Sequence, residues 1–191
     1  MSPQIPFIIS TPSDLIDTGP IHLMQEKNVT QSNRQVRKKQ PNSRHCFVCG
    51  LENQYGLKLT FFNTKPGEVV VETVIPDHFQ GYPGVVHGGI VASIVDEALG
   101  RAQMGEDPEN SRFLYTAKLS IQFRKPVPLN TPIRVVGQAV RSKKLTATSI
   151  AKIFDQDGQL LVEAEAILIN VPDENLKEVD MENLGWKVYA D

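Results

Sequence analysis

The stretch Val85-Val86-His87-Gly88-Gly89-Ile90-Val91-Ala92-Ser93-Ile94-Val95-Asp96-Glu97-Ala98-Leu99-Gly100 decides the fold of this chain of 191 residues. From Ile90 onward its apolar residues recur every three to four positions, which is the spacing of a helix and not the alternation of a strand. The apolar face covers roughly 200° of a helical wheel, wider than the stripe of an ordinary surface helix. The sequence therefore predicts a largely covered helix with one acid, Asp96, at the edge of its apolar face.

A His-Gly-Gly turn opens this helix. Gly88 and Gly89 carry no Cβ, so the backbone N–H groups of the first turn stay open to a ligand atom. The positive end of the helix dipole points to the same place, which suits an oxyanion or a phosphate. At about 1.5 Å per residue, His87 and Asp96 lie roughly 13 Å apart along the axis, too far to meet within one chain. Two helices packed antiparallel about a two-fold axis would bring them together, so we expect an obligate homodimer with two sites.

The sequence outside this helix predicts mainly β-strands. Alternation is clearest where Leu119, Ile121 and Phe123 face one way and the polar residues between them face the other. No helical pattern separates the later strands, which excludes a doubly wound parallel sheet. The pattern predicts an α+β fold in which one antiparallel sheet wraps around one helix. The predicted strands are 57–63, 68–75, 112–123, 133–140, 145–154 and 160–170.

The composition of the chain excludes some classes of function. The net charge of −2 gives no general attraction for nucleic acid, and no apolar run approaches the length of a membrane span. We therefore expect a soluble cytoplasmic protein without nucleic-acid or membrane partners. The length fits one domain at 44–170, preceded by a polar, partly flexible extension at 1–43 and followed by an acidic tail at 171–191 that packs on a neighbour or frays.

Two cysteines stand in the run His45-Cys46-Phe47-Val48-Cys49. Structural zinc takes four ligands, and neither a second cysteine pair nor a close histidine pair follows in the sequence. The sequence therefore predicts no metal site. It predicts a turn that leads into the first strand and in which both cysteines are reduced. A zinc site and a redox pair are the alternatives, and metal analysis of the purified protein tests the first of them.

Three groups of residues occur in a characteristic order. They are Cys46-Phe47-Val48-Cys49-Gly50 with Gly56-Leu57-Lys58-Leu59, then Gly84-Val85-Val86-His87-Gly88-Gly89 with Asp96, and then Thr116-Ala117-Lys118-Leu119-Ser120-Ile121-Gln122-Phe123-Arg124-Lys125-Pro126-Val127-Pro128. As a set, these motifs resemble hot-dog-fold acyl-CoA thioesterases of the PaaI-like family over about residues 44–170. The resemblance implies a hot-dog fold and hydrolysis of acyl-CoA thioesters, with coenzyme A as part of the substrate and no cofactor.

The resemblance also implies roles for particular residues. Asp96 corresponds to the acid that activates water or attacks the thioester carbonyl, and the sequence does not separate a general base from a nucleophile. Gly88 corresponds to the residue whose backbone N–H polarises that carbonyl. Thr116 resembles a hydroxyl residue that orients the water or the acid, and His87 would shape the turn beside the carbonyl. The expected catalytic residues are thus Asp96, Gly88, His87 and Thr116.

Further residues are expected to contact the substrate. Several relatives carry Asn or Gln shortly before the His-Gly-Gly turn, and Gln80 stands near that place, offset by one residue. Two basic clusters could hold the phosphates of coenzyme A by charge-assisted hydrogen bonds, the alternative being solvated strand and hairpin ends. The expected substrate-binding residues are Gly89, Gln80, Arg124, Lys125, Arg141, Lys143 and Lys144.

Two other functions remain open. The loop His78-Phe79-Gln80-Gly81-Tyr82-Pro83-Gly84 resembles a loop of hot-dog dehydratases or hydratases, although the spacing to the acid fits them poorly. The second alternative is a dimer that binds acyl-CoA without turnover. Whether the expected homodimer assembles further into a dimer of dimers does not follow from the sequence. We expect Phe113, Tyr115 and Met104 to close the acyl tunnel, while the acyl preference itself does not follow from the sequence.

Overall fold

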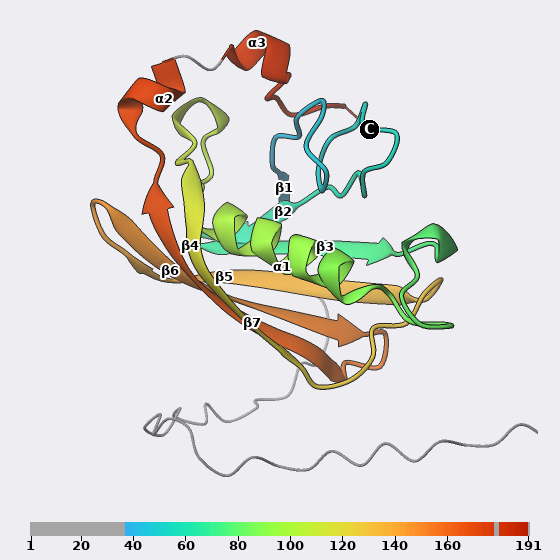
Figure 1. Ribbon diagram of the computed structural model, residues 1–191. Helices are drawn as coiled ribbons and strands as arrows, with labels where there is room; N and C mark the ends of the chain where they lie inside the picture. The colour runs from blue at the N-terminus through green and yellow to red at the C-terminus, as the bar shows by residue number, and fades with distance from the viewer. Residues whose placement is uncertain (1–36, 178–179, 191) are drawn as a thin grey trace, which may run out of the picture. The chain divides into compact units, whose positions relative to one another are not determined.

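The computed structural model describes residues 37–177 and 180–190. Within them, one antiparallel sheet curves around the long helix α1 (Figure 1). The α+β class predicted from periodicity is therefore confirmed. The elements are β1 (Lys38–Lys39), β2 (Phe62–Lys65), β3 (Glu68–Val74), α1 (Gly88–Ala102), β4 (Leu114–Phe123), β5 (Pro132–Ser142), β6 (Thr146–Asp155), β7 (Leu160–Asn170), α2 (Asp173–Lys177) and α3 (Met181–Leu184), with short 3₁₀ turns at Asp77–Phe79 and Pro108–Asn110.

The order of strands in the sheet leaves β4 at one edge. The order is β1-β2-β3-β5-β6-β7-β4, and each neighbouring pair is antiparallel. After β3 the chain passes through α1 and returns as β4, which pairs with β7 at the far side of the sheet. The ten residues of β4 are all exposed or half-buried, so one side of this strand is open to pairing with another chain.

The helix α1 supplies the centre of the core. Its most deeply buried side chains recur at the spacing expected from the sequence, at Val91, Ile94, Val95, Ala98 and Leu99. They pack against inward-facing residues of the sheet in one cluster. On β5, a Cβ built at Gly137 would collide with the carbonyl oxygen of Ala98, so a glycine is needed where the helix backbone crosses this strand. The broad apolar face predicted for the helix is thus confirmed.

Most predicted strands agree with the observed ones, and the first is the exception. The prediction at 160–170 coincides with β7, and those at 68–75, 112–123, 133–140 and 145–154 overlap β3, β4, β5 and β6. At 57–63 the ladder begins only at Phe62. The N–H groups of Leu57 and Leu59 donate instead to the carbonyl oxygens of Phe47 and Val48, in the turn that holds the cysteines. The strand prediction was wrong for Leu57 to Leu59 because their backbone N–H groups pair with the cysteine turn and not with a neighbouring strand.

The end of the predicted extension is packed against the domain. Residues 1–36 lie outside the described ones, whereas β1 pairs with β2 and the following polar residues are buried. The N–H of Gln40 donates to the carbonyl of Phe61, and the side-chain amide of Asn42 donates to the carbonyls of Cys49 and Leu59. These polar side chains are buried because each one satisfies backbone groups of the domain.

The described part of the C-terminal tail also packs on the domain. The ring of Trp186 lies edge-on to Phe113, with centroids 5.3 Å apart, and Lys187 pairs with Asn42 through backbone hydrogen bonds. Of the two predicted outcomes for the tail, packing applies to these residues. None of the helices in the described ranges is both long enough and apolar enough to cross a membrane.

Candidate active site

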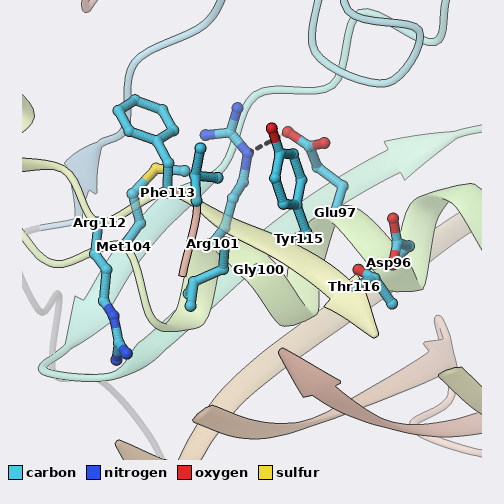
Figure 2. Close-up of a pocket in the computed structure, with 11 residues that line it drawn as sticks. Asp96, Glu97, Gly100, Arg101, Met104, Arg112, Phe113, Tyr115 and Thr116 are labelled. Atoms are coloured by element: carbon cyan, nitrogen blue, oxygen red, sulfur yellow. Dashed lines mark hydrogen bonds and ion pairs between the residues drawn. The ribbon is translucent and has the colours of Figure 1, made fainter. Parts of the chain in front are cut away.

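Asp96 on α1 and Thr116 on β4 lie side by side (Figure 2). The Thr116 hydroxyl donates a hydrogen bond of 2.7 Å to one carboxylate oxygen of Asp96. This bond fixes the orientation of the carboxylate and leaves its second oxygen to a water or a substrate. The structure thus brings together two of the residues that the sequence proposed as catalytic.

A β-bulge turns Thr116 toward the helix. In an unbroken strand, Thr116 would share a face with Lys118 and point away from the face of Leu119. The ladder between β4 and β7 shifts between Thr116 and Lys118, so that Thr116 lies opposite Leu168 and Leu119 lies opposite Ala166. Leu168 and Ala166 are both buried in the core. The bulge therefore places the Thr116 hydroxyl on the core side of the sheet, within reach of Asp96.

The His-Gly-Gly turn caps α1 with the histidine ring. His87 is the N-cap residue, and its Nδ1 accepts a hydrogen bond of 3.0 Å from the N–H of Gly89. A Cβ on Gly89 would lie 3.1 Å from that nitrogen, so glycine permits the close approach. Among the described residues, no acceptor takes the N–H of Gly88, and a Cβ there would meet no atom closer than 3.8 Å. The first N–H of the helix is thus open to an external acceptor at the positive end of the dipole.

Gln80 braces the loop that leads into this turn. Its side-chain carbonyl accepts a hydrogen bond of 3.1 Å from the N–H of Gly84, and its backbone forms an isolated bridge with Val86. Gly84 has a φ of +78°, a conformation that other residues rarely adopt. The structure therefore gives Gln80 a contact within the loop, and substrate contact by Gln80 stays a prediction.

The two basic clusters lie at opposite ends of β4. Arg124, just after the strand, forms an ion pair of 2.9 Å with Glu163 on β7, and Lys125 follows it on the surface. The hairpin between β5 and β6 lies near the start of β4, because Arg112 donates to the carbonyl of Lys143. A single chain therefore does not bring these clusters together. The exposed basic side chains of the hairpin end are Arg141, Lys143 and Lys144.

A cavity of about 250 Å³ adjoins Asp96 and Thr116. Figure 2 shows these two residues at one end of it, with Met104 and Phe113 toward the other end and Tyr115 between them. All three residues expected to close an acyl tunnel thus line the same cavity. Its size is close to the lower end of the range for small-molecule sites.

A buried ion pair forms part of the cavity wall. Arg101 is 1% exposed and pairs with Glu97 at 2.7 Å. Its Nη1 donates to the side-chain carbonyl of Gln40 and to the backbone carbonyl of Pro41, and its guanidinium lies 4.7 Å from the ring centre of Phe61. Burial lowers the pKa of Arg101, but the negative charges of Glu97 and Cys49 and the hydrogen bonds to both groups together outweigh it and raise the pKa overall. The guanidinium therefore stays charged inside the domain.

A protein-family model matches the segment that contains these site residues. The family model described as "Thioesterase superfamily" matches residues 83–162, which contain the His-Gly-Gly turn, α1 and Thr116. Residues 83–162 are thus similar to the thioesterase superfamily. The family resemblance inferred from the sequence motifs is therefore confirmed for this part of the chain.

Curated relatives of this chain carry a specific name. Acyl-coenzyme A thioesterase THEM4 from Rattus norvegicus is 31% identical over 134 residues, which are 68% of this chain and 56% of that protein. THEM4 from Mus musculus is 33% identical over 99 residues, 51% of this chain and 40% of that protein. The chain spans about half the length of the curated relatives it matches.

Solved structures share the fold of this chain. A crystal structure described as a thioesterase superfamily protein has a TM-score of 0.60 at 29% identity, and the match covers 66% of this chain and 60% of that chain. The E. coli PaaI protein of the phenylacetic acid degradation operon has a TM-score of 0.55 at 16% identity, covering 61% and 81%. A hypothetical thioesterase from Streptococcus pneumoniae, solved with coenzyme A, has a TM-score of 0.53 at 22% identity, covering 58% and 84%. These similarities confirm the hot-dog fold.

Sequence reasoning missed Arg101, the charged side chain that is buried most deeply among the described residues. The signal was present, because Glu97 and Arg101 stand four residues apart on the predicted helix, the spacing of a helical ion pair. Ion pairs at this spacing are usually exposed to solvent. The spacing alone does not show that the segment around Gln40 and Pro41 covers the pair of Glu97 and Arg101.

Proposed function

We propose that this protein hydrolyses acyl-CoA thioesters to a free acid and coenzyme A. The observation that carries the proposal is the hydrogen-bonded pair of Asp96 and Thr116 at the end of a cavity of about 250 Å³. The similarity of the chain to proteins named acyl-coenzyme A thioesterase supports the reaction class. A structural neighbour that was solved with coenzyme A supports coenzyme A as part of the substrate.

In the proposed reaction, the N–H of Gly88 donates a hydrogen bond to the thioester carbonyl oxygen. This donor stabilises the negative charge that develops on the oxygen, an effect of on the order of 3 kcal/mol per donor in comparable sites. Asp96 either takes a proton from the attacking water or attacks the carbonyl carbon itself. In both routes the carbon–sulfur bond breaks, the acyl group gains the oxygen of water, and coenzyme A leaves as a thiol.

One chain does not complete this site. Eight residues separate Gly88 from Asp96, about 12 Å along the helix. The two residues also lie beside different parts of β4. A Cβ on Gly88 would face the ring of Phe123 at 3.8 Å, whereas Asp96 is bonded to Thr116. The helix therefore runs antiparallel to β4, with its open N–H near the end of the strand and its acid near the start.

This arrangement defines how a second copy completes the site. If two β4 edges pair antiparallel about a two-fold axis, with Thr116 opposite the partner's Phe123, the axis passes between Leu119 and Ser120. Asp96 then lies beside the partner's Gly88, and the reverse pair forms at the second site. The open, partly apolar edge of β4 supports this pairing, since Tyr115 is 49% and Phe123 53% exposed. We infer a homodimer in this register, and a dimer of dimers stays a prediction.

The same register supports a role for the basic residues. Tyr115 and Leu114 would lie opposite the partner's Arg124 and Lys125. The hairpin with Arg141, Lys143 and Lys144 is tied to the same end of the cavity through Arg112. Both clusters would thus gather near one substrate, where they can bind the phosphates of coenzyme A.

The reaction is tested by measuring thiol release from aryl, short-chain and long-chain acyl-CoAs. The proposal expects coenzyme A to be released with at least one of these classes. Binding of acyl-CoA without thiol release would indicate a non-catalytic binding dimer instead. Dehydration of a hydroxyacyl thioester would favour the dehydratase or hydratase alternative.

Thr116→Val is expected to lower kcat by about ten- to a hundredfold. The substitution keeps the shape of the side chain but removes a hydrogen bond to a charged group, a contribution of about 1.5–3 kcal/mol. Thr116→Ser keeps the hydroxyl and should retain most of the activity. Steady-state kinetics of both variants check this, and a valine variant as fast as wild type would remove Thr116 from the site.

A further inference from the structure

The described residues hold a second chemical cluster, next to the candidate active site and separate from its proposed reaction. Cys46 and Cys49 occupy one turn, closed by a 2.9 Å hydrogen bond from the N–H of Gly50 to the carbonyl of Cys46. A Cβ on Gly50 would collide with that carbonyl, so the turn depends on glycine. The two sulfur atoms and a carboxylate oxygen of Glu97 lie within 4.8 Å of one another. The pair is thus held close enough for its sulfurs to react after side-chain rotation.

The two thiols differ in access. Cys46 is half-buried, whereas Cys49 is 2% exposed and its sulfur lies 3.6 Å from the hydroxyl of Ser43. The sulfur of Cys46 accepts hydrogen bonds from the N–H groups of Val48 and Cys49, at 3.3 and 3.4 Å. Backbone donors of this kind stabilise a thiolate. Cys46 is therefore the thiol that an outside reagent meets, with Cys49 directly behind it.

The hydrogen bond between the two thiols moves their pKa values in opposite directions. The hydrogen bond from the Cys46 thiol lowers the pKa of Cys49 to about 7, and the Arg101 guanidinium contributes in the same direction. The same hydrogen bond, burial and the Glu97 charge raise the pKa of Cys46. The thiolate of this state therefore lies on Cys49, where it can accept the proton of Cys46 as that thiol reacts.

We propose that Cys46 and Cys49 form a reversible intrachain disulfide by exchange with a low-molecular-weight disulfide. The Cys46 thiolate attacks one sulfur of the reagent RSSR, forms a mixed disulfide and expels RS⁻. The Cys49 thiolate then attacks the Cys46 sulfur and expels a second RS⁻. The two leaving groups take up the two cysteine protons as 2 RSH. The protein loses two electrons, and the reagent gains them.

The same cluster is a poor cation site. Glu97 is already paired with Arg101 at 2.7 Å, so a divalent ion between the two sulfurs and this carboxylate would lie beside a fixed positive charge. Within the described ranges, the cluster supplies only three such ligands, whereas structural zinc takes four. The described residues of this cluster therefore do not fit a structural zinc site.

Oxidation of the two cysteines would change the surroundings of Glu97 and Arg101, which line the cavity. The Cys46 thiol lies 3.8 Å from a carboxylate oxygen of Glu97, the neighbour of Asp96, and Arg101 lies next to Cys49. A disulfide removes both the thiol donor and the thiolate charge from this ion pair. The single tryptophan of the chain, Trp186, lies 5.5 Å from the Arg101 guanidinium, so its fluorescence should report the change.

The test treats the reduced full-length protein with excess oxidised glutathione, blocks remaining thiols and measures the intact mass. We expect both free thiols to be lost, a product about two hydrogen masses lighter, and a shift in Trp186 emission, all reversed by dithiothreitol. The rate should rise with pH through about 7, as the shared thiolate of the pair forms. This assay is independent of acyl-CoA turnover, so its failure leaves the proposed hydrolysis intact.

Two variants test the order of attack. Cys49→Ser should stop at a stable glutathione adduct on Cys46, because the resolving thiol is gone. Cys46→Ser should leave the buried Cys49 unmodified until the protein is unfolded. Two thiols that stay free in the wild-type protein, a disulfide only between chains, or stoichiometric zinc that protects both sulfurs would each overturn the proposal.

Discussion

Asp96→Asn is expected to lower kcat for acyl-CoA hydrolysis by about 10²- to 10⁴-fold, the usual contribution of a positioned general base. The amide keeps the size of the carboxylate and can still accept the hydrogen bond from Thr116. It cannot take a proton from water or attack a carbonyl carbon. Because binding contacts remain, KM and the dimer should change little. Steady-state kinetics together with sedimentation measure both quantities.

The matched control is Asp157→Asn. Asp157 is an exposed acid in the turn between β6 and β7, away from the cavity, so the same chemical change there should leave kcat within about twofold of wild type. If the Asp96 variant hydrolyses acyl-CoA at the rate of this control, Asp96 is not the activating acid.

Arg101→Met is expected to lower the free energy of unfolding by about 3–5 kcal/mol. The substitution leaves Glu97 without its partner at 22% exposure. It also leaves the side-chain carbonyl of Gln40 and the backbone carbonyl of Pro41 without their shared donor. The methionine fills much of the arginine volume, so the loss reflects uncompensated polar groups more than a cavity. Urea unfolding monitored by circular dichroism measures the change.

Arg134→Met serves as the control for this stability prediction. Arg134 is half exposed and lies 3.9 Å from Glu72, so its loss should cost less than about 1 kcal/mol. An Arg101 variant that unfolds at the same urea concentration as this control would show that the buried ion pair contributes little net stability.

The sequence was sufficient for the framework of the fold. The spacing of apolar residues predicted α1 and its buried face. The His-Gly-Gly turn predicted open N–H groups at Gly88 and Gly89, but among the described residues only that of Gly88 is open, because the N–H of Gly89 donates to Nδ1 of His87. Alternation predicted most of the strands. These signals are local, since each depends on residues a few positions apart.

Features that depend on distant contacts could not be predicted. Strict alternation turns Thr116 away from α1, and only the bulge in the β4–β7 ladder reverses this. Likewise, the segment from Leu57 to Leu59 has strand character, but the cysteine turn takes its hydrogen bonds. The burial of Arg101 depends on Gln40, which lies 61 residues away in the sequence. In each case a remote partner overrides the local pattern.

The most direct test of the shared site is complementation between two inactive variants. Asp96→Asn removes the acid. Gly88→Pro removes the proposed N–H donor at the first helical position, where proline is well tolerated. His87 before it already has an extended backbone, with φ −58° and ψ 134°, as a residue preceding proline requires. Each variant alone should form an inactive dimer.

Mixed dimers carrying one chain of each variant, isolated through two different affinity tags, then decide the question. If Asp96 acts with the partner's Gly88, one of the two sites holds both intact residues and the other holds neither. The account predicts about half of the wild-type turnover per dimer. Mixed dimers as inactive as the two parent variants would contradict it, because each site would then draw both residues from a single chain.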